Sequence, residues 1–530
     1  MTNLFAPNGL PWSSQQNAIL DWFANGTGNL VVRARAGTGK TSVIAEGVER
    51  SPEASVLVTS FGKYTVGELN RRLRRSRNAE AITLNGVGHR IVLDRRKDTK
   101  LDCFCVPRVN HGKVIAATVL FEDAKAQTLA RPDDPTASDD APDDVVTLVD
   151  ELAEKGKESA VGVFLNWLQP DGDKRRAVDS MIALAYKHGC TPDRELVDEG
   201  WSVERIAVLA FRAMALARRR DGTINWADQV FLPIVNDWSP RRPYDMIVVD
   251  EAQDMNEAQL LLALRVTRGR VCIVGDDRQA IYGFRGADSQ SIDRLKFELG
   301  AIELPLSVSF RCDKRIIAVT QRLVGDITAS PSAGAGSVTT ISAAAIFAAA
   351  QPGDFILSRK NAPLAGICLG LLRSGKRATI KGKDVGRGLI ALLKRFGKTR
   401  SVDDLMKRIW RWCKSEIEKI EKEDQGAIGK EDAIDQIRDK AELLVNLCDG
   451  IASVAELVKR IETLFTEDSG PAMIVCSTVH KAKGLEADRV FLLSWTFRED
   501  GPEEINILYV AQTRARHELV FVEASDAKCR

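Results

Sequence analysis

The sequence lacks any long hydrophobic run. Its longest apolar stretch, residues 343–350, is far too short to cross a bilayer. Residues 1–12 contain neither the basic region nor the apolar run of an export signal. These absences exclude the membrane class, and we expect a soluble, cytoplasmic protein.

Cysteines at metal-site spacing are also lacking, although the chain has ten cysteines. The nearest approach to a cluster is Cys103 and Cys105 with His111, which has no fourth ligand, so buried packing explains these residues better. We find no zinc, iron–sulfur or nuclease signature and no repeat at a fixed period. Reduced thiols in a chain of this size agree with a cytosolic setting.

No charge of one sign dominates, because 75 basic and 73 acidic residues leave a formal net charge of +2. The distribution is nevertheless uneven. Residues 71–100 hold ten basic and three acidic side chains, residues 373–400 hold ten and one, and residues 132–154 hold nine acids and no base. The two basic stretches are either solvated faces or a track for a polyanion, and both interpretations stay open.

Short apolar runs alternate with helix-like segments along most of the 530 residues. The length favours three or four domains, and the alternation predicts α/β lobes with parallel sheets. Two stretches, residues 93–204 and 386–465, break the pattern and are predicted to be mainly helical insertions. The predicted strands include residues 30–32, 56–58, 246–249, 271–274, 355–357, 473–476 and 490–493.

The second predicted insertion has helical periodicity. Its apolar positions recur at intervals of three and four residues, which predicts a small helical hairpin that buries its own seam. These positions are Trp410, Cys413, Ile417 and Ile420 in one helix, and Ile434, Ile437, Ala441 and Leu444 in the other.

A phosphate-binding loop, ARAGTGKT, follows the first predicted strand and precedes a helix-compatible segment. Ala34 stands where the first glycine of this motif is usual. Gly37 and Gly39 let the backbone N–H groups face phosphates, and the helix N-terminus adds a favourable dipole. Lys40 is predicted to reach the β- and γ-phosphates of ATP, and Thr41 to offer its hydroxyl to Mg²⁺.

An acidic motif, VVDEAQD, ends a second apolar strand. In a chain with a phosphate loop, Asp250 is predicted to hold Mg²⁺ and Glu251 to orient and deprotonate the attacking water. Adjacent carboxylates at a strand end can also simply face solvent, which is the alternative.

The wider set of motifs resembles the UvrD/Rep/PcrA-like helicases of superfamily 1. The resemblance implies two RecA-like lobes: residues 1–92 with 205–300, and 301–385 with 466–530. It also places accessory domains at residues 93–204 and at 386–465, where the second is reduced in size. The motifs, in the family's order, are WSSQQNAI, ARAGTGKT, TLNGVGHRIV, VVDEAQD, VGDDRQAIYGFRGA, LSVSFRC, STVHKAKGLE and ILYVAQTRA.

The resemblance also implies residue roles around ATP. Gln15 reads the adenine edge, Phe310 stacks on its ring, and Glu486 lies near the ribose. Gln279 senses the γ-phosphate, and Arg311 and Arg514 act on it as arginine fingers. The loop residues expected to surround the phosphates are Ala36, Gly37, Thr38, Gly39, Lys40 and Thr41. Ser42 departs from the family, in which arginine often follows this loop.

A nucleic-acid track is implied at a further set of positions, where aromatic side chains stack on bases. For a single aromatic residue core packing is the alternative, and for the two histidines a hydrogen-bonded structural role is the alternative. The set is Phe61, Lys63, Thr83, His89, Tyr282, Phe284, Arg285 and His480.

The expected function is an ATP-dependent helicase or translocase on single-stranded DNA and at junctions with duplex. The resemblance implies 3′→5′ polarity and action as a monomer. The first alternative is a DNA-stimulated ATPase that works with a partner, such as a nuclease in phage defence or a repair or replication factor, without unwinding strongly by itself. The second is an inactive DNA-binding adaptor, which the complete set of charged site residues disfavours.

Overall fold

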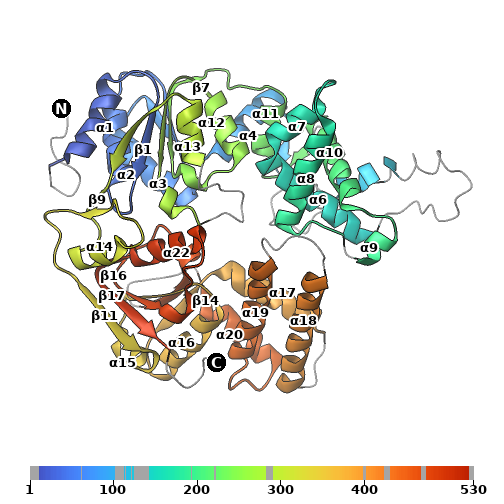
Figure 1. Cartoon of the computed structure of the whole chain (residues 1–530), viewed down its shortest axis with the longest axis vertical. Helices are drawn as coiled ribbons and strands as arrows, with labels where there is room; N and C mark the ends of the chain where they lie inside the picture. Colours follow the sequence, from blue (N-terminus) through green and yellow to red (C-terminus); the bar gives the residue numbers. More distant parts are fainter. Residues whose placement is uncertain are drawn as a thin grey trace, which may run out of the picture. The chain divides into compact units, whose positions relative to one another are not determined.

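A computed structural model of the chain describes residues 11–60, 62–101, 113, 115–120, 122–123, 142–192, 194–219, 222–281, 291–397, 401–422, 430–466 and 473–524 (Figure 1). The chain divides into two compact units. The first comprises Met1–Arg33 and Lys40–Leu306, and the second comprises Ala34–Gly39 and Ser307–Arg530. Each contains one large sheet of mainly parallel strands. The predicted α/β class with two RecA-like lobes is therefore confirmed.

The sheet of the first unit has the strand order β3 (Ala79–Ala81), β2 (Val56–Ser60), β6 (Tyr244–Asp250), β7 (Thr267–Gly275), β1 (Leu30–Ala34) and β8 (Ile302–Leu306). The neighbours from β3 to β1 pair in parallel. β2 is buried along its whole length, as expected for a parallel strand covered on both faces. The apolar runs predicted as strands in this lobe all lie within these elements.

Helices cover this sheet, and two of them begin at capping boxes. Ser13 and Gln16 exchange hydrogen bonds at the start of one helix, and Asn256 and Gln259 do so at another. The helices and 3₁₀ turns are α1 (Ser14–Asn25), α2 (Lys40–Arg50), α3 (Lys63–Arg72), η1 (Leu73–Arg75), α4 (Leu84–Arg95), α11 (Asp228–Val235), η2 (Ala252–Asp254), α12 (Glu257–Arg265), η3 (Asp277–Gln279) and α13 (Ser291–Glu298).

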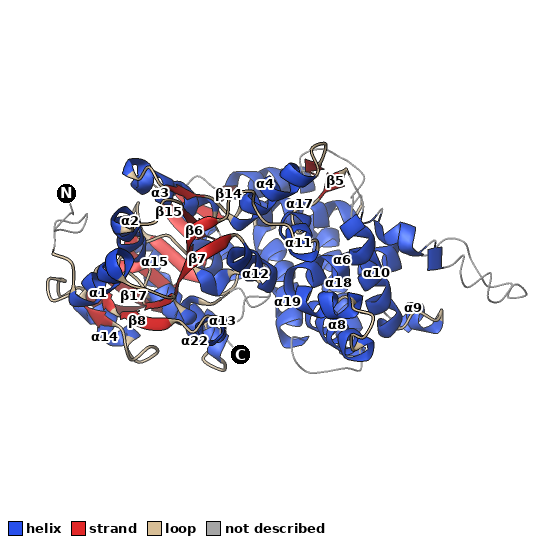
Figure 2. Cartoon of the chain, turned by 90° about the horizontal axis from the view of Figure 1, so that it is seen from above, coloured by secondary structure: helices blue, strands red, loops and turns tan. Residues whose placement is uncertain are grey.

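A helical group lies between two short paired strands, β4 (Lys100–Leu101) and β5 (Thr223–Ile224). Figure 2 shows α6, α8 and α10 of this group without strands among them. Its described helices are α6 (Asp143–Ser159), α7 (Val161–Leu168), α8 (Lys174–His188), α9 (Arg194–Asp198) and α10 (Val203–Arg219). The predicted boundary of this insertion, residues 93–204, stays a prediction.

The first insertion shares a core with its lobe. Phe164 of α7 lies 6.1 Å from Phe211 of α10 and 5.5 Å from Phe231 of α11, measured between ring centroids. Lys157 of α6 is buried, and its Nζ lies 2.8 Å from Asp228 of α11. A buried ion pair of this kind fixes geometry, because removing one partner leaves the other charge buried and unpaired.

The sheet of the second unit is parallel throughout. Its strand order is β11 (Ser337–Ser342), β17 (Ala515–Glu523), β16 (Ala487–Leu493), β12 (Phe355–Ser358), β15 (Ile474–Thr478), β13 (Ala378–Lys381) and β14 (Phe465–Thr466). A separate two-stranded pair consists of β9 (Val308–Ser309) and β10 (Thr328–Ala329). The predicted strands of this lobe lie in β12, β15 and β16, except that Met473 precedes β15 by one residue.

The helices of the second unit fall into two groups. The first accompanies the sheet: α14 (Lys314–Thr320), η5 (Ala343–Ala345), α15 (Ile346–Ala349), α16 (Ala362–Arg373), α21 (Val479–Ala482), η6 (Ser494–Thr496) and α22 (Pro502–Gln512). The second forms the predicted insertion: α17 (Lys383–Arg395), α18 (Val402–Lys422), α19 (Lys430–Leu447) and α20 (Val454–Leu464). Its boundary at residues 386–465 stays a prediction.

The predicted hairpin of α18 and α19 is present, and Cys413, Ala441 and Leu444 of its predicted seam are buried, but these residues also pack against the lobe. Asp439 of α19 accepts the N–H of Asn361 (2.9 Å) and that of Ala362 (2.8 Å), so it caps α16. Leu444 of α19 lies in the same hydrophobic core as Ile356 of β12. The apolar face that the periodicity indicates therefore packs against the lobe that contains the sheet as well as against the neighbouring helix.

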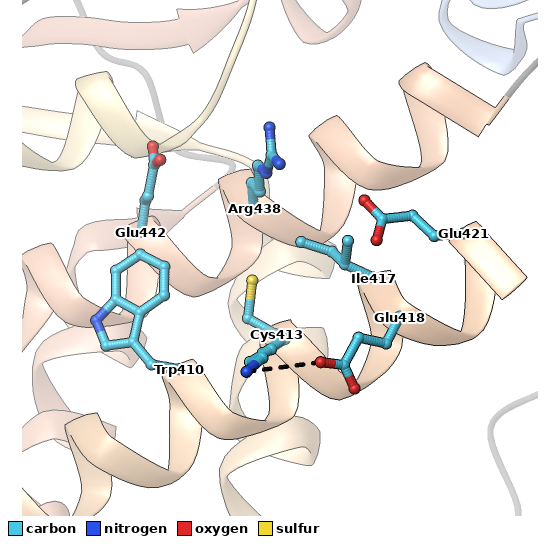
Figure 3. A pocket seen from close by; sticks show the side chains of 8 residues that line it. Trp410, Cys413, Ile417, Glu418, Glu421, Arg438 and Glu442 are labelled. Atoms are coloured by element: carbon cyan, nitrogen blue, oxygen red, sulfur yellow. Dashed lines mark ion pairs between the residues drawn. The ribbon is translucent and has the colours of Figure 1, made fainter. Parts of the chain in front are cut away.

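The other end of the predicted seam is open. Trp410 is 46% exposed, and a cavity of about 580 Å³ lies between α18 and α19 (Figure 3). Glu418, which pairs with Lys414 at 3.7 Å, is one of three glutamates on its wall. The lining residues are Trp410, Cys413, Lys414, Ile417, Glu418, Glu421, Arg438 and Glu442.

No helix within the described ranges is both long and apolar enough to cross a membrane. Among the same residues, no group of histidine, cysteine and carboxylate side chains has the geometry of a metal cluster. The cysteines that the structure describes are buried and form no disulfide. Cys103, Cys105 and His111 lie outside these ranges.

Candidate nucleotide and nucleic-acid site

The phosphate loop connects β1 to α2, as predicted. Gly37 and Gly39 have φ angles of +73° and +81°, a left-handed backbone that favours glycine. A Cβ on Gly37 would lie 2.5 Å from the Cβ of Arg311, so no larger residue fits there. Thr38 donates its hydroxyl to the carbonyl of Arg35 at 2.9 Å, which closes the turn.

Residues 34–39 group with the second unit, and two hydrogen bonds are among their contacts with it. The N–H of Ala36 donates to the hydroxyl of Tyr509 at 2.9 Å, and the N–H of Phe310 donates to the carbonyl of Gly37 at 2.8 Å. Tyr509 precedes Arg514 by five residues in the last predicted motif, but its contact with the loop was not predicted.

Lys40 begins α2 and is paired within the first unit. Its Nζ lies 2.8 Å from Oε1 of Glu251, which follows β6. Burial alone would lower the pKa of Lys40, but the nearby carboxylates, Glu251 foremost, outweigh it and hold that pKa above its usual value. The lysine is therefore a cation, and in this structure Glu251 takes the position of an anionic partner.

Asp250 is the last residue of β6 and is almost fully buried. Burial and the neighbouring Glu251 carboxylate raise the pKa of Asp250 to about 7, against the opposing effect of Lys40. Glu251 itself has a left-handed φ of +54°, unusual for a non-glycine residue and of a kind that clusters at functional sites.

The carboxylate of Asp250 fits a divalent cation. Its Oδ1 accepts the N–H of Glu251 at 2.9 Å, whereas Oδ2 is buried and has no hydrogen-bond partner among the described residues. A buried carboxylate oxygen without a partner is the kind of ligand that Mg²⁺ takes. Thr41 is the second residue of α2, and its predicted role toward the metal stays a prediction.

Gln253 joins the acidic pair to the next motif, a role the sequence did not suggest. Its Nε2 donates to Glu251 at 2.6 Å, and its Oε1 accepts the N–H of Asp276 at 3.0 Å. Asp276 in turn accepts from Nε2 of Gln279 at 2.7 Å. Lys40, Glu251, Gln253, Asp276 and Gln279 thus form one chain of contacts, which follows β6 and β7 at the carboxyl edge of the sheet. The sequence signal for this role of Gln253 was only its amide side chain, two residues after Glu251.

The predicted arginine fingers belong to the second unit, where each is held by its own lobe. Nε of Arg311 lies 2.6 Å from Glu486, and its Nη1 donates to the carbonyl of Thr513 at 3.3 Å. Arg514 is 1% exposed and donates to the carbonyls of Val510 (2.9 Å) and Leu485 (3.1 Å). The structure therefore places Arg311 beside Glu486, a residue expected near the nucleotide ribose.

Burial of Arg514 has an electrostatic consequence. Burial and the nearby Arg311 guanidinium lower the pKa of Arg514 to about 10. Three of its five N–H groups are committed, to the two carbonyls and to the hydroxyl of Thr513 at 3.2 Å. The guanidinium is thus held in place by hydrogen bonds to backbone and hydroxyl oxygens of its own lobe.

The two predicted contacts to the adenine base are partly exposed. Gln15 is the second residue of α1, beside Gln16, whose side chain is occupied by the capping box. Phe310 follows β9. Their roles toward adenine stay predictions.

One predicted nucleic-acid residue, Lys63, lies beside a tryptophan that the sequence did not single out. Trp226 is 38% exposed, and Nζ of Lys63 lies 5.2 Å from the centroid of its ring. Asn85 of α4 donates to the carbonyl of Trp226 at 2.9 Å. Thr83 caps α4 by accepting the N–H of Gly86 at 3.2 Å, so it has a structural task there. An exposed aromatic ring beside a lysine is a suitable platform for a base.

The other predicted track residues are less informative. Nδ1 of His89 is buried without a hydrogen-bond partner in the described part of the chain, which does not support a hydrogen-bonded structural role for this atom. His480 lies in α21 and is partly buried. The residues Phe61, Tyr282, Phe284 and Arg285 lie outside the described residues.

Some basic side chains of residues 71–100 form ion pairs with nearby glutamates. Arg71 and Arg72 both contact Glu68, and Arg90 contacts Glu80 at 2.7 Å. Arg72 also donates to Ser42, the residue that departs from the family pattern, at 2.9 Å. A solvated face and a polyanion track both remain open for residues 71–100.

Comparison with known families identifies both lobes. The UvrD/REP helicase N-terminal domain matches residues 204–299, and the UvrD-like helicase C-terminal domain matches residues 473–522. Part of each lobe is thus similar to UvrD/Rep-like helicases. The first match contains Asp250, Glu251 and Gln279 of the site, and the second contains Glu486 and Arg514.

Curated proteins similar to this chain include DNA helicases of low sequence identity. F-box DNA helicase protein 1 of Schizosaccharomyces pombe is 24% identical over 97% of this chain and 58% of its own length. DNA helicase IV and DNA helicase II of Escherichia coli are each 25% identical, over 57% and 56% of this chain and over 45% and 38% of their own lengths. The chain thus spans about half the length of these curated relatives.

Proposed function

We propose that this chain is an ATP-driven DNA motor, a helicase or translocase that moves on single-stranded DNA. The observation that carries the proposal is the chain of contacts from Lys40 through Glu251 and Gln253 to Gln279. A lysine for phosphates, a carboxylate for water and an amide for the γ-phosphate are what phosphoryl transfer from ATP to water requires at one place.

In this proposal Lys40 exchanges Glu251 for the β- and γ-phosphates of ATP. Glu251, released from the lysine, orients a water molecule and accepts its proton as the water oxygen attacks the γ-phosphorus. The bond from the γ-phosphorus to the bridging oxygen breaks, which leaves ADP and phosphate. Asp250 and Thr41 would hold Mg²⁺, which would neutralise phosphate charge when bound. Arg311 and Arg514 stabilise the charge that develops on the transferred group.

The protein moves along the strand if nucleotide binding and release change its affinity for single-stranded DNA. The contacts Lys63–Trp226 and Asn85–Trp226 support a base-stacking site on the first lobe. Cycles of binding and hydrolysis then alternate two states with different affinities for the strand, and the difference becomes translocation. The resemblance to UvrD/Rep-like helicases supports 3′→5′ polarity and action as a monomer.

A second candidate is a DNA-stimulated ATPase that needs a nuclease or another partner for robust unwinding. The features that favour it lie in the second insertion. α19 is fixed to the lobe through Asp439, and the cavity beside it has three glutamates against one lysine and one arginine on its wall, a poor surface for duplex DNA.

The test is the ATPase rate with and without single-stranded DNA, followed by unwinding of duplexes with 3′ or 5′ tails. We expect stimulation by the strand and unwinding from 3′ tails. Lys40→Ala should abolish turnover and leave strand binding largely intact. Stimulation without unwinding would favour the partner-dependent ATPase, and ATP turnover by Lys40→Ala at the wild-type rate would refute the motor.

A further inference from the structure

The loop that carries Trp226 lies between β5 and α11 in the first unit. Its indole is 38% exposed beside Lys63, whereas its backbone carbonyl accepts a hydrogen bond from Nδ2 of Asn85 at 2.9 Å. Asn85 is the second residue of α4. The backbone that supports the exposed ring is therefore held by a side chain from another element.

The other end of the Asn85 amide contacts α12. Oδ1 of Asn85 accepts a hydrogen bond from Nε2 of Gln259 at 3.2 Å. Gln259 is the third residue of α12, and its Oε1 accepts the N–H of Asn256 at 3.1 Å in the capping box that begins this helix. A capping box uses only the oxygen of the glutamine amide, so the hydrogen bond to Asn85 is additional to it. The two amides thus join the carbonyl of Trp226 to the start of α12.

The start of α12 is connected to the acidic motif by a short closed turn. Asn256 follows Glu251 by five residues. Between them, the N–H of Asp254 donates to the carbonyl of Glu251 at 3.0 Å, and the N–H of Met255 donates to that of Ala252 at 3.2 Å. Because backbone hydrogen bonds close this turn, a shift of Asn256 is passed to Glu251.

Close packing holds together the helices around these amides. α4 packs against both α11 and α12. A Cβ on Gly88 of α4 would lie 2.0 Å from the carbonyl oxygen of Gln229 in α11 and 3.2 Å from Cδ2 of Leu262 in α12. Tightly packed elements deform little and therefore transmit strain. The hydrogen bonds of Asn85 thus lie within a rigid contact between three helices.

The loop of Trp226 is also held from the side of the first insertion. Asp228 accepts the N–H of Asn225 at 3.1 Å, and Asn225 accepts that of Asp228 at 3.0 Å. Oδ1 of Asp228 lies 2.8 Å from Nζ of the buried Lys157. The contact through Asn85 leads from the loop to the acidic motif, whereas the contact through Asp228 leads to the insertion.

We propose that Asn85 and Gln259 are positioning residues that couple strand binding at Trp226 to ATP hydrolysis at Glu251. The inference rests on the proposed motor function, with Trp226 as its base-stacking site. A base that stacks on the indole fixes the loop, and the two amides pass this constraint to the start of α12 and so to the acidic motif. Neither amide contacts ATP or the strand in this scheme.

The principal variant is Gln259→Glu in the full-length chain. Glutamate keeps the capping box, because its carboxylate still accepts the N–H of Asn256, and a negative charge suits the first turn of a helix. It cannot donate to Asn85, so the hydrogen bond between the two side chains is lost. Gln16→Glu is the matched control, because Gln16 has the same place in the capping box of α1, where its Oε1 accepts the N–H of Ser13.

The readout is the ATPase rate at saturating ATP, with and without saturating oligothymidylate, together with the KM for ATP and the melting temperature. We expect Gln259→Glu to lower stimulation by the oligonucleotide at least about fivefold, the lower end of typical coupling between two sites. Its unstimulated rate, KM and melting temperature should stay near wild type. Gln16→Glu should leave the stimulation ratio unchanged.

A second variant, Asn85→Leu, removes both hydrogen bonds of that amide without adding charge. It should lower stimulation as much as Gln259→Glu does, and the double variant should lose no more than either single variant, because both side chains act in one path. Asn29→Leu is its control, because the Asn29 amide contacts the carbonyl of Leu299 and the N–H of Val271. These contacts lie at the start of β1, so Asn29→Leu should lower the melting temperature and keep the stimulation ratio.

An unchanged stimulation ratio in Gln259→Glu would overturn the inference, and so would a fall of its stimulated and unstimulated rates in proportion. Additive losses in the double variant would also contradict it, because the two amides would then act separately. If Asn85→Leu does not fold, Gln259→Glu alone decides, since it keeps its helix cap. A wild-type protein that hydrolyses ATP without stimulation by the strand would instead refute the proposed motor, which is a different outcome.

Discussion

The two units hold their buried cations in opposite ways. Lys40 of the first unit is paired with a carboxylate, and its pKa is raised, whereas Arg514 of the second unit is held by carbonyls and a hydroxyl, and its pKa is lowered to about 10. Arg514 is buried and the side chain of Lys40 is largely buried, so burial alone does not decide the direction. The partner decides, because a carboxylate compensates the charge and a carbonyl dipole does so only in part.

This difference indicates that Lys40 acts mainly in catalysis, whereas Arg514 also supports the fold of its lobe. The contacts of Lys40 are with groups that have chemical tasks in the proposed reaction, so a change there should affect turnover more than folding. The contacts of Arg514 are with the backbone of its own lobe. A change at Arg514 should therefore affect turnover and folding together.

The largest effect should follow from Arg514→Ala. We expect turnover to fall by about 10³–10⁵, the usual loss for an arginine finger. The protein should also lose about 1–3 kcal/mol of stability, because the carbonyls of Val510 and Leu485 lose their buried donor. ATPase assays and urea unfolding measure the two losses. A variant that loses turnover at unchanged stability would contradict the structural role of Arg514.

Glu251→Gln should lower turnover by about 10²–10⁴, the contribution of a general base. ATP affinity should not fall, because the amide no longer competes as a carboxylate for Lys40. The melting temperature should stay within a few degrees of wild type, in contrast to Arg514→Ala. A collapse of ATP affinity in this variant would make Glu251 a structural residue.

A smaller effect concerns pH and the buried carboxyl of Asp250. Its pKa is raised from a usual 3.8 to about 7, so the folded state binds a proton that the unfolded state has released between these pH values. Folding stability contributed by this group is therefore lost as pH rises from about 4 to about 7, by up to about 1.4 kcal/mol per pH unit.

Asp250→Asn removes this titration. Unfolding by urea, measured without nucleotide or magnesium, should show the variant gaining stability over wild type as pH rises to about 7, and no further change above it. A constant difference over the whole range would mean that Asp250 is ionised throughout.

The smallest predicted effect is on strand binding. Trp226→Ala should weaken the affinity for single-stranded DNA by about 1–3 kcal/mol, the range for one stacked base. Trp410→Ala is the control, since Trp410 is at least as exposed but lines the cavity of the second insertion. Fluorescence anisotropy with a labelled oligonucleotide measures both. Equal losses in the two variants would remove Trp226 from the proposed track.

Most strands of the two large sheets could be predicted from the sequence, because a buried parallel strand is a short and nearly continuous run of apolar residues. It also predicted that Lys40 and Glu251 act at one site, since a phosphate loop and an acidic strand end occur together in this chemistry. What it could not predict were contacts between motifs. Gln253 reads as an ordinary polar residue until the structure places both ends of its amide in hydrogen bonds.

Two further residues escaped sequence analysis for different physical reasons. Arg33 interrupts a buried strand, and its contacts include Glu303 and Asp293, which lie 270 and 260 residues away in the chain. Trp226 follows a two-residue strand that carries no periodicity. The hairpin of α18 and α19 was predicted but its packing on the lobe was not, because helical periodicity indicates that a face is buried and not which element covers it.

The cap that Asp439 places on α16 has a consequence for synthesis of the chain. The N–H of Ala362 and the carboxylate that accepts it are 77 residues apart. At a translation rate of about 5–20 residues per second, α16 leaves the ribosome roughly 4–15 s before its cap exists. During this interval the second sheet lacks β15, β16 and β17 as well, so the nascent lobe waits for the helical insertion before it can close its core.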